Sequence, residues 1–164
     1  MGVLKIISRI LGLLSILCLT GLIIVVSMQI LSRYLPLSYV WTEELTRYLF
    51  LYAIGFAAPL ALLRNEYINV DLIVNRFPET FRRYYDIGVY VLIALISAIL
   101  IKEGWTFIEI GRAQMSATMP FSMSVIHASL FIMGVFLLIM SLVRIGFLFK
   151  NKKNPFETTY GGEL

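Results

Sequence analysis

The chain has 164 residues, of which 59% are hydrophobic and only 15% are charged. This composition lies far outside the average of soluble globular domains, so it excludes a separate water-soluble domain and predicts one membrane unit over residues 1–150, followed by a polar tail over 151–164. The formal net charge of +4 requires no nucleic-acid partner, because basic residues commonly flank membrane spans.

Four apolar stretches predict an all-α integral membrane protein with four spanning helices. The first span, at about 10–32, contains no charged residue and exceeds the roughly 30 Å hydrocarbon core as a helix. Its length, and the lack of a small-x-small cleavage site at its end, favour a retained helix over a cleaved signal peptide. Cys18, the one cysteine, falls within this span and is expected to be an inert buried thiol.

The next two spans are expected at about 41–63 and 84–105. Their uncharged cores are shorter than a crossing requires, so each has to include polar neighbours at its ends. Between them, apolar and polar residues alternate loosely ahead of Pro78, which predicts a short amphipathic helix on the membrane surface. The last span is placed at about 122–146, because Pro120 interrupts the start of its apolar stretch.

The basic residues predict the orientation. Four crossings put both termini on one side, and that side then holds most of the 14 Lys and Arg residues, which are Lys5, Arg9, Arg64, Arg76, Arg82, Arg83, Arg144, Lys150, Lys152 and Lys153. The other side holds Arg33, Arg47, Lys102 and Arg112. The positive-inside rule therefore predicts cytoplasmic termini.

The residues that carry chemistry are few. His127 is the only histidine, so two-histidine haem ligation within the chain is impossible, and no Cys/His set for a metal is present. No glycine-rich phosphate loop or nucleophile-and-base set occurs either, so we expect no enzyme and no cofactor in this chain. A single histidine in a span is expected to bond a neighbouring helix.

Two features of the second span are candidates for a structural or partner interface. Glu43 and Glu44 precede Arg47 by four and three residues, so either carboxylate could pair with the guanidinium on a helix. This cluster either neutralises itself to let a short helix enter the membrane or docks another protein. A small-residue strip also allows close approach of another helix, with packing inside the chain's own bundle as the favoured reading. It consists of Ala53, Gly55, Ala57, Ala58 and Ala61, with Pro59 within it.

The run WTEELTRYLFLYAIGFAAPLALLRNEYINVD, from Trp41 to Asp71, resembles a known family. It is similar to the small membrane subunit of tripartite ATP-independent periplasmic (TRAP) transporters, which share a Trp-x-Glu-Glu-Leu-x-Arg-Tyr start, a small-residue helix and an Arg-to-Val-Asp segment. The matching positions are Trp41, Glu43, Glu44, Leu45, Arg47, Tyr48, Gly55, Ala57, Ala58, Arg64, Ile68, Val70 and Asp71, and they continue into Phe77, Pro78 and Arg82. The chain departs from the family at Tyr67, where histidine is frequent.

The resemblance implies a multi-pass subunit of the bacterial inner membrane. Its partners would be a large multi-spanning transport subunit, which binds sodium and substrate, and a periplasmic substrate-binding protein. The small subunit would act as a scaffold in contact with membrane lipid, with Trp41, Glu43, Glu44, Arg47, Tyr48, Gly55, Arg64 and Asp71 as its structural or partner interface. Family substrates are organic acids such as C4-dicarboxylates and sialic acid. Two alternatives remain: a self-contained homo-oligomeric transporter or channel, and a membrane anchor of a respiratory complex.

Overall fold

The fold is all-helical across the residues described by the structure, a computed structural model that places 2–34, 40–64 and 79–149. Its helices are α1 (Gly2–Ser32), α2 (Trp41–Arg64), α4 (Glu79–Arg112) and α5 (Ser124–Phe149). All four are long and apolar enough to cross a membrane. The prediction of a four-helix membrane protein is therefore confirmed.

The helices extend beyond the predicted apolar spans. α1 starts eight residues before the predicted boundary, and α4 begins at Glu79 and ends at Arg112, outside the predicted 84–105. Hydropathy marks the part of a helix that lies in hydrocarbon, but Lys, Arg and Glu are good helix formers, so the backbone continues through them. The predicted surface helix before Pro78 and the tail at 151–164 lie outside the described residues.

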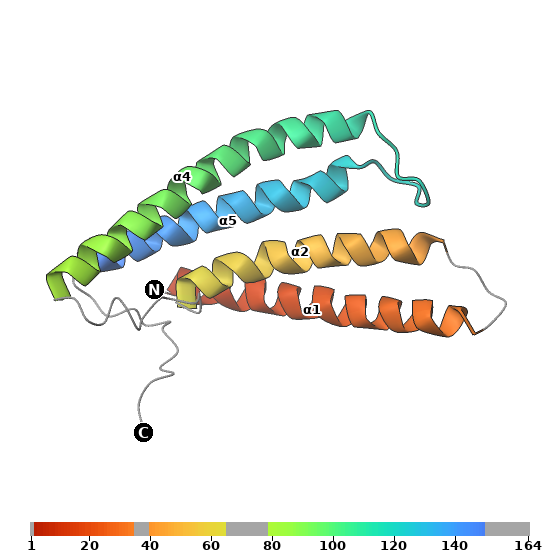
Figure 1. The fold of residues 1–164 in the computed structure, drawn as a ribbon, viewed down its shortest axis with the longest axis horizontal. Coiled ribbons are helices and arrows are strands. Elements are labelled where there is room, and N and C mark those ends of the chain that lie inside the picture. The colour runs from red at the N-terminus through yellow and green to blue at the C-terminus, as the bar shows by residue number, and fades with distance from the viewer. Residues whose placement is uncertain (1, 35–39, 65–78, 150–164) are drawn as a thin grey trace, which may run out of the picture.

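The four helices stand side by side in a single row (Figure 1). α1 packs on α2, α2 packs on α5, and α5 packs on α4, so α1 and α4 form the two edges of the row. The start of α1 and the end of α5 lie at the same end of the molecule, as four crossings require (Figure 1). That this end faces the cytoplasm stays a prediction.

Close contacts at small residues hold neighbouring helices together. A Cβ atom placed on Gly12 of α1 would lie 3.5 Å from a methyl carbon of Leu60 in α2. Ser15 of α1 donates a hydrogen bond to the carbonyl oxygen of Ala53 in α2 over 3.4 Å. Without much hydrophobic driving force between helices in lipid, such close packing and interhelical hydrogen bonds stabilise the pair.

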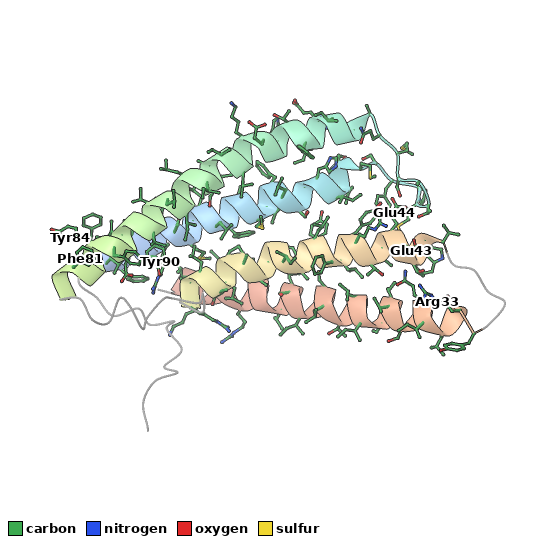
Figure 2. The ribbon with its side chains drawn as sticks, viewed as in Figure 1. Arg33, Glu43, Glu44, Phe81, Tyr84 and Tyr90 are labelled. Carbon is green, nitrogen blue, oxygen red and sulfur yellow. The ribbon has the colours of Figure 1, made fainter. Side chains whose placement is uncertain are left out.

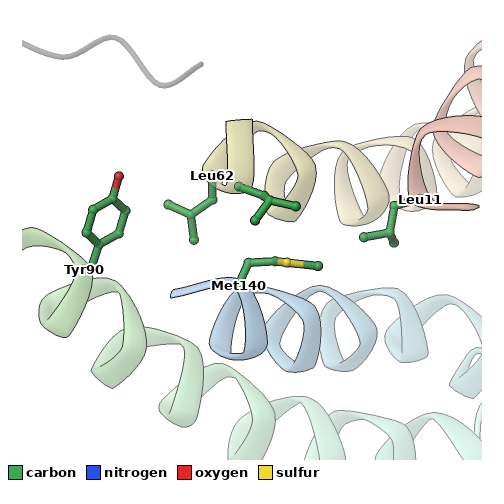
Figure 3. Close-up of a cluster of buried hydrophobic side chains, with 5 residues drawn as sticks. Leu11, Leu62, Tyr90 and Met140 are labelled. Atoms are coloured by element: carbon green, nitrogen blue, oxygen red, sulfur yellow. The ribbon is translucent and has the colours of Figure 1, made fainter. Parts of the chain in front are cut away.

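The core lies at the end of the row where α1 starts and α5 ends. Leu11, Leu62, Leu63, Tyr90 and Met140 are buried together there and join all four helices (Figure 3). Arg144 of α5 is buried beside this cluster, with 7% of its surface exposed. Its Nε and Nη2 donate hydrogen bonds to the hydroxyl oxygen of Tyr90, over 3.0 and 2.7 Å. A buried guanidinium thus depends on a phenol of the neighbouring helix.

We expect Tyr90→Phe to lower the stability of the α4–α5 pair by roughly 1–3 kcal/mol, because it removes the acceptor of a charged buried donor. Thermal unfolding of the purified protein in detergent measures the effect. Tyr84→Phe is the matched control, since Tyr84 is 71% exposed on the same helix. Equal melting temperatures for the two variants would contradict this account of Arg144.

Candidate functional site: the junction of α2 with the α4–α5 loop

Glu44, in the first turn of α2, is bonded to a segment far along the chain. Its Oε2 accepts a hydrogen bond of 3.0 Å from the backbone N–H of Thr118 and a second from the Thr118 hydroxyl. Its Oε1 accepts a hydrogen bond from the hydroxyl of Tyr48, one helical turn further along α2. One carboxylate therefore connects the start of α2 to the loop between α4 and α5.

The loop from Ala113 to Met123 has an internal order that presents Thr118 to Glu44. Met115 and Ser122 form an isolated antiparallel bridge, and the amide of Ser116 donates to the carbonyl oxygen of Phe121 over 3.0 Å. The amide of Met123 donates to the carbonyl oxygen of Gln114 over 2.9 Å. The loop is thus a small hairpin, closed by its own backbone hydrogen bonds.

Tyr48 packs into the same hairpin. Its ring meets that of Phe121 edge to face, with 5.7 Å between the ring centres. Its hydroxyl lies 3.4 Å from the Ser116 hydroxyl, and only 8% of the residue is exposed. We call Glu44, Tyr48, Ser116, Thr118 and Phe121 the α2–loop junction. It combines a charge-assisted hydrogen-bond network with an aromatic contact, which fixes the position of the loop.

The contact continues along one face of α2. Tyr52 follows Tyr48 by four residues, and its hydroxyl donates a hydrogen bond to the carbonyl oxygen of Val125 at the start of α5. A Cβ atom on Gly55 would lie 3.3 Å from the carbonyl oxygen of Ser129. Residues four apart share a helix face, so Glu44, Tyr48 and Tyr52 bind the loop and the first turn of α5 in succession.

The predicted pairing with Arg47 does not form among the described residues. Glu43 and Arg47 are both exposed, whereas the Glu44 carboxylate accepts hydrogen bonds from Thr118. A backbone N–H and two hydroxyls fix the Glu44 side chain, and a surface ion pair is weak by comparison. The two acidic residues thus have different roles: Glu44 binds within the chain, and Glu43 lies on the surface beside the end of α1, where Arg33 lies (Figure 2).

The other predicted interface residues are spread along α2. Trp41 is half-buried in its first turn, and Arg64 lies in its last turn, at the opposite end of the molecule from the junction. Asp71 lies outside the described residues. Within the small-residue strip, Ala53 and Gly55 are buried, and Gly55 lies close to α5. This agrees with the favoured hypothesis that the strip packs inside the chain's own bundle.

A second set of close contacts, between α4 and α5, was not foreseen from the sequence. Cβ atoms on Gly104 and Gly134 would lie 3.1 Å from atoms of Phe131 and Ile101 respectively. A Cβ atom on Gly111 would lie 2.6 Å from the backbone nitrogen of Ser124. The seven-residue spacing of Gly104 and Gly111 places both on one helix face and is the signal that could have revealed this interface.

His127 contributes to this second interface as predicted for a single intramembrane histidine. Its Nδ1 lies 2.8 Å from the carbonyl oxygen of Phe107 in α4, and its ring packs edge to face against the Phe107 ring. Because a carbonyl can only accept, Nδ1 carries the proton and donates. Over the described residues, no group of three or more His, Cys, Asp and Glu side chains gathers as a metal site would.

Comparison with known proteins identifies the family. The sequence model of the tripartite ATP-independent periplasmic transporters, DctQ component, matches residues 22–151. The chain belongs to this family. It is a small permease subunit of the TRAP type and a multi-pass protein of the inner membrane.

Three relatives illustrate how TRAP proteins resemble the chain. The sialic acid TRAP transporter small permease protein SiaQ of Vibrio cholerae is 26% identical over 86% of this chain and 82% of its own length. The isethionate TRAP transporter permease protein DctMQ of Oleidesulfovibrio alaskensis is 27% identical over 58% of this chain. The sialic acid TRAP transporter permease protein SiaT of Haemophilus influenzae is 32% identical over 46% of this chain. The chain spans only 16% and 12% of the lengths of these last two relatives.

Proposed function

We propose that this chain is the non-catalytic small membrane subunit of a sodium-coupled TRAP importer of organic acids, and that it acts as a scaffold for a large transport subunit. Sodium and substrate would bind to that partner and not to this chain. A periplasmic substrate-binding protein would deliver the substrate at the side opposite the cytoplasmic termini. The substrate is proposed to be an organic anion, because the relatives are named for sialic acid and for isethionate.

The observation that carries the scaffold role is the single row of helices. The row has two broad faces and two edges. Exposed apolar side chains cover both edge helices. Leu13, Ile16 and Leu17 of α1 and Leu92, Leu95 and Ile99 of α4 are each more than half exposed. A compact four-helix bundle would enclose a core or cavity between its helices, whereas a row offers its surface to lipid and to a neighbouring protein.

The lengths of two relatives support a large membrane partner. DctMQ and SiaT are named permease proteins, and this chain matches only a small share of each. Their remaining length is several times that of this chain, so a segment similar to it occurs there within one much larger permease polypeptide. We infer that the separate chain meets the equivalent large permease subunit in the same membrane.

The α2–loop junction fixes the hairpin from Ala113 to Met123 at the end of the row away from the predicted cytoplasmic side. A periplasmic binding protein would approach the chain at this end. Glu43 and Arg33 are exposed at the same end (Figure 2), and Arg47 is exposed in the second turn of α2. Together they offer charges of both signs for such a contact. Docking there would be an electrostatic contact on a rigid surface.

Deleting the gene for this chain tests the proposal. Uptake of the transported organic acid should be lost, and the large permease subunit should assemble poorly in the membrane, because its scaffold is missing. Uptake is followed with radiolabelled substrate, and assembly by blue native electrophoresis of the tagged large subunit. A deletion strain with normal uptake and a normally assembled large subunit would refute the scaffold role.

A further inference from the structure

The outer face of α4 carries exposed charged and polar side chains within its membrane-spanning part. Lys102 and Glu103 form an ion pair of 3.9 Å, with side chains that are 83% and 55% exposed. Thr106 and Glu109 follow on the same side of the helix and are also exposed. The residues of α4 that face α5, including Ser97, Gly104 and Gly111, are buried on its opposite side. We call Lys102, Glu103, Thr106 and Glu109 the α4 polar face.

Contacts with α5 show how deep this face lies. A Cβ on Gly104 would touch Phe131, and a Cβ on Gly134 would lie 3.2 Å from the backbone nitrogen of Ile101. Lys102 and Glu103 are therefore level with the segment from Phe131 to Gly134. This places Lys102 deeper than the count of basic residues predicted, which assigned it to the side opposite the termini. The part of α5 without Asp, Glu, Lys or Arg runs from Ser124 to Val143, about 30 Å at the usual helical rise, so that segment is near its middle.

An exposed Lys–Glu pair at this depth is poorly matched to lipid. Ionisable groups within spans usually face protein or a water-filled cavity, because acyl chains cannot hydrogen-bond them. The long stem of Lys102 could carry its ammonium toward the headgroups. Glu103 has a shorter side chain, so its carboxylate reaches less far toward the headgroups. Because α4 is an edge of the row, no helix described in this chain covers the α4 polar face.

We infer that the α4 polar face is the contact surface for the large permease subunit. This inference rests on the proposed function and adds to it the edge of the row that meets the partner. The occupant is a membrane-spanning helix that presents a carboxylate, amide or free carbonyl to the Lys102 ammonium near mid-membrane, and a hydroxyl or amide donor to Glu103. Leu95 and Ile99, on the same side of α4, supply the apolar part of the contact.

Site-specific photocrosslinking in the co-expressed complex tests this assignment. A photoreactive residue is placed at Thr106 on α4 or, as a matched control, at Thr20, which is an exposed threonine on α1 at the other edge. The adduct should join position 106 to the large subunit, with several-fold less product from position 20. Crosslinking from position 20 alone, from neither position in a complex that still co-purifies, or from position 106 to a second copy of this chain would overturn the inference and leave the proposed function standing. Failure of the large subunit to co-purify with the unmodified chain would instead refute the proposed function.

A double variant gives an independent readout. Lys102→Leu with Glu103→Leu should reduce recovery of the complex about tenfold. The polar groups of the partner helix would lose the ammonium and the carboxylate to which they hydrogen-bond. The chain purified alone should melt at an unchanged temperature. Thr20→Leu with Ser27→Leu replaces two exposed polar side chains of α1, at the other edge of the row, by leucine and should leave recovery unchanged. Equal recovery for the two double variants would contradict the inference.

Discussion

Gly111→Ala is expected to destabilise the α4–α5 pair by roughly 1–3 kcal/mol, the usual cost of forcing extra volume into a packed contact. The added Cβ would lie 2.6 Å from the backbone nitrogen of Ser124 and 2.7 Å from Nδ1 of His127. Backbone at the first turn of α5 cannot move aside without disturbing the hydrogen bond of His127 to Phe107. Thermal unfolding in detergent measures the loss.

The chain supplies two controls for this substitution. Gly88 and Gly146 lie in α4 and α5, and a Cβ on either meets nothing within 4 Å. Alanine is a better helix former than glycine, so Gly88→Ala and Gly146→Ala should leave stability unchanged or raise it. A Gly111→Ala variant that melts at the same temperature as these controls would show that α4 and α5 do not approach each other closely at Gly111.

Glu44→Ala is expected to release the loop from α2 and to lower the melting temperature by several degrees, whereas Glu43→Ala should have little effect. Removal of the carboxylate leaves the Thr118 amide, the Thr118 hydroxyl and the Tyr48 hydroxyl without their acceptor. Glu43 is exposed and has no such bonds in the described part of the chain. Glu44→Gln keeps one acceptor oxygen, so its melting temperature should lie between those of Glu44→Ala and Glu43→Ala.

Hydrogen exchange at the Thr118 amide separates a local effect from general instability. The amide donates to Glu44, so its exchange should accelerate strongly in Glu44→Ala and not in Glu43→Ala. Amides in the middle of α5 serve as an internal reference and should keep their protection. Unchanged exchange at Thr118 in Glu44→Ala would show that the α2–loop junction does not hold the loop.

The apolar runs in the sequence were sufficient to predict the four helices, because the hydropathy of a segment depends only on its own residues. Each apolar run appears as one helix in the structure, and the resemblance carried by the segment from Trp41 to Asp71 agrees with the family assignment. Helix ends were less well placed, since charged residues such as Lys5 and Arg9 continue α1 without lying in hydrocarbon. Local propensity favours helix on both sides of the membrane boundary.

The site was only partly predictable because its contacts join distant segments. The sequence singled out Glu44 and Tyr48 but offered Arg47 as the partner, which is the nearest opposite charge along the helix. The actual partner, Thr118, is 74 residues away in a loop without any motif of its own. The burial of Arg144 against Tyr90 was likewise not predicted, because a basic residue near the end of a span is expected to contact lipid headgroups.

The most direct test of the central claim is native mass spectrometry of this chain purified with its companions from bacterial membranes. The account predicts a complex with one large polytopic permease subunit, in which neither protein alone supports uptake in liposomes. A homo-oligomer of this chain that lacks any companion and transports solute across a liposome membrane by itself would contradict it.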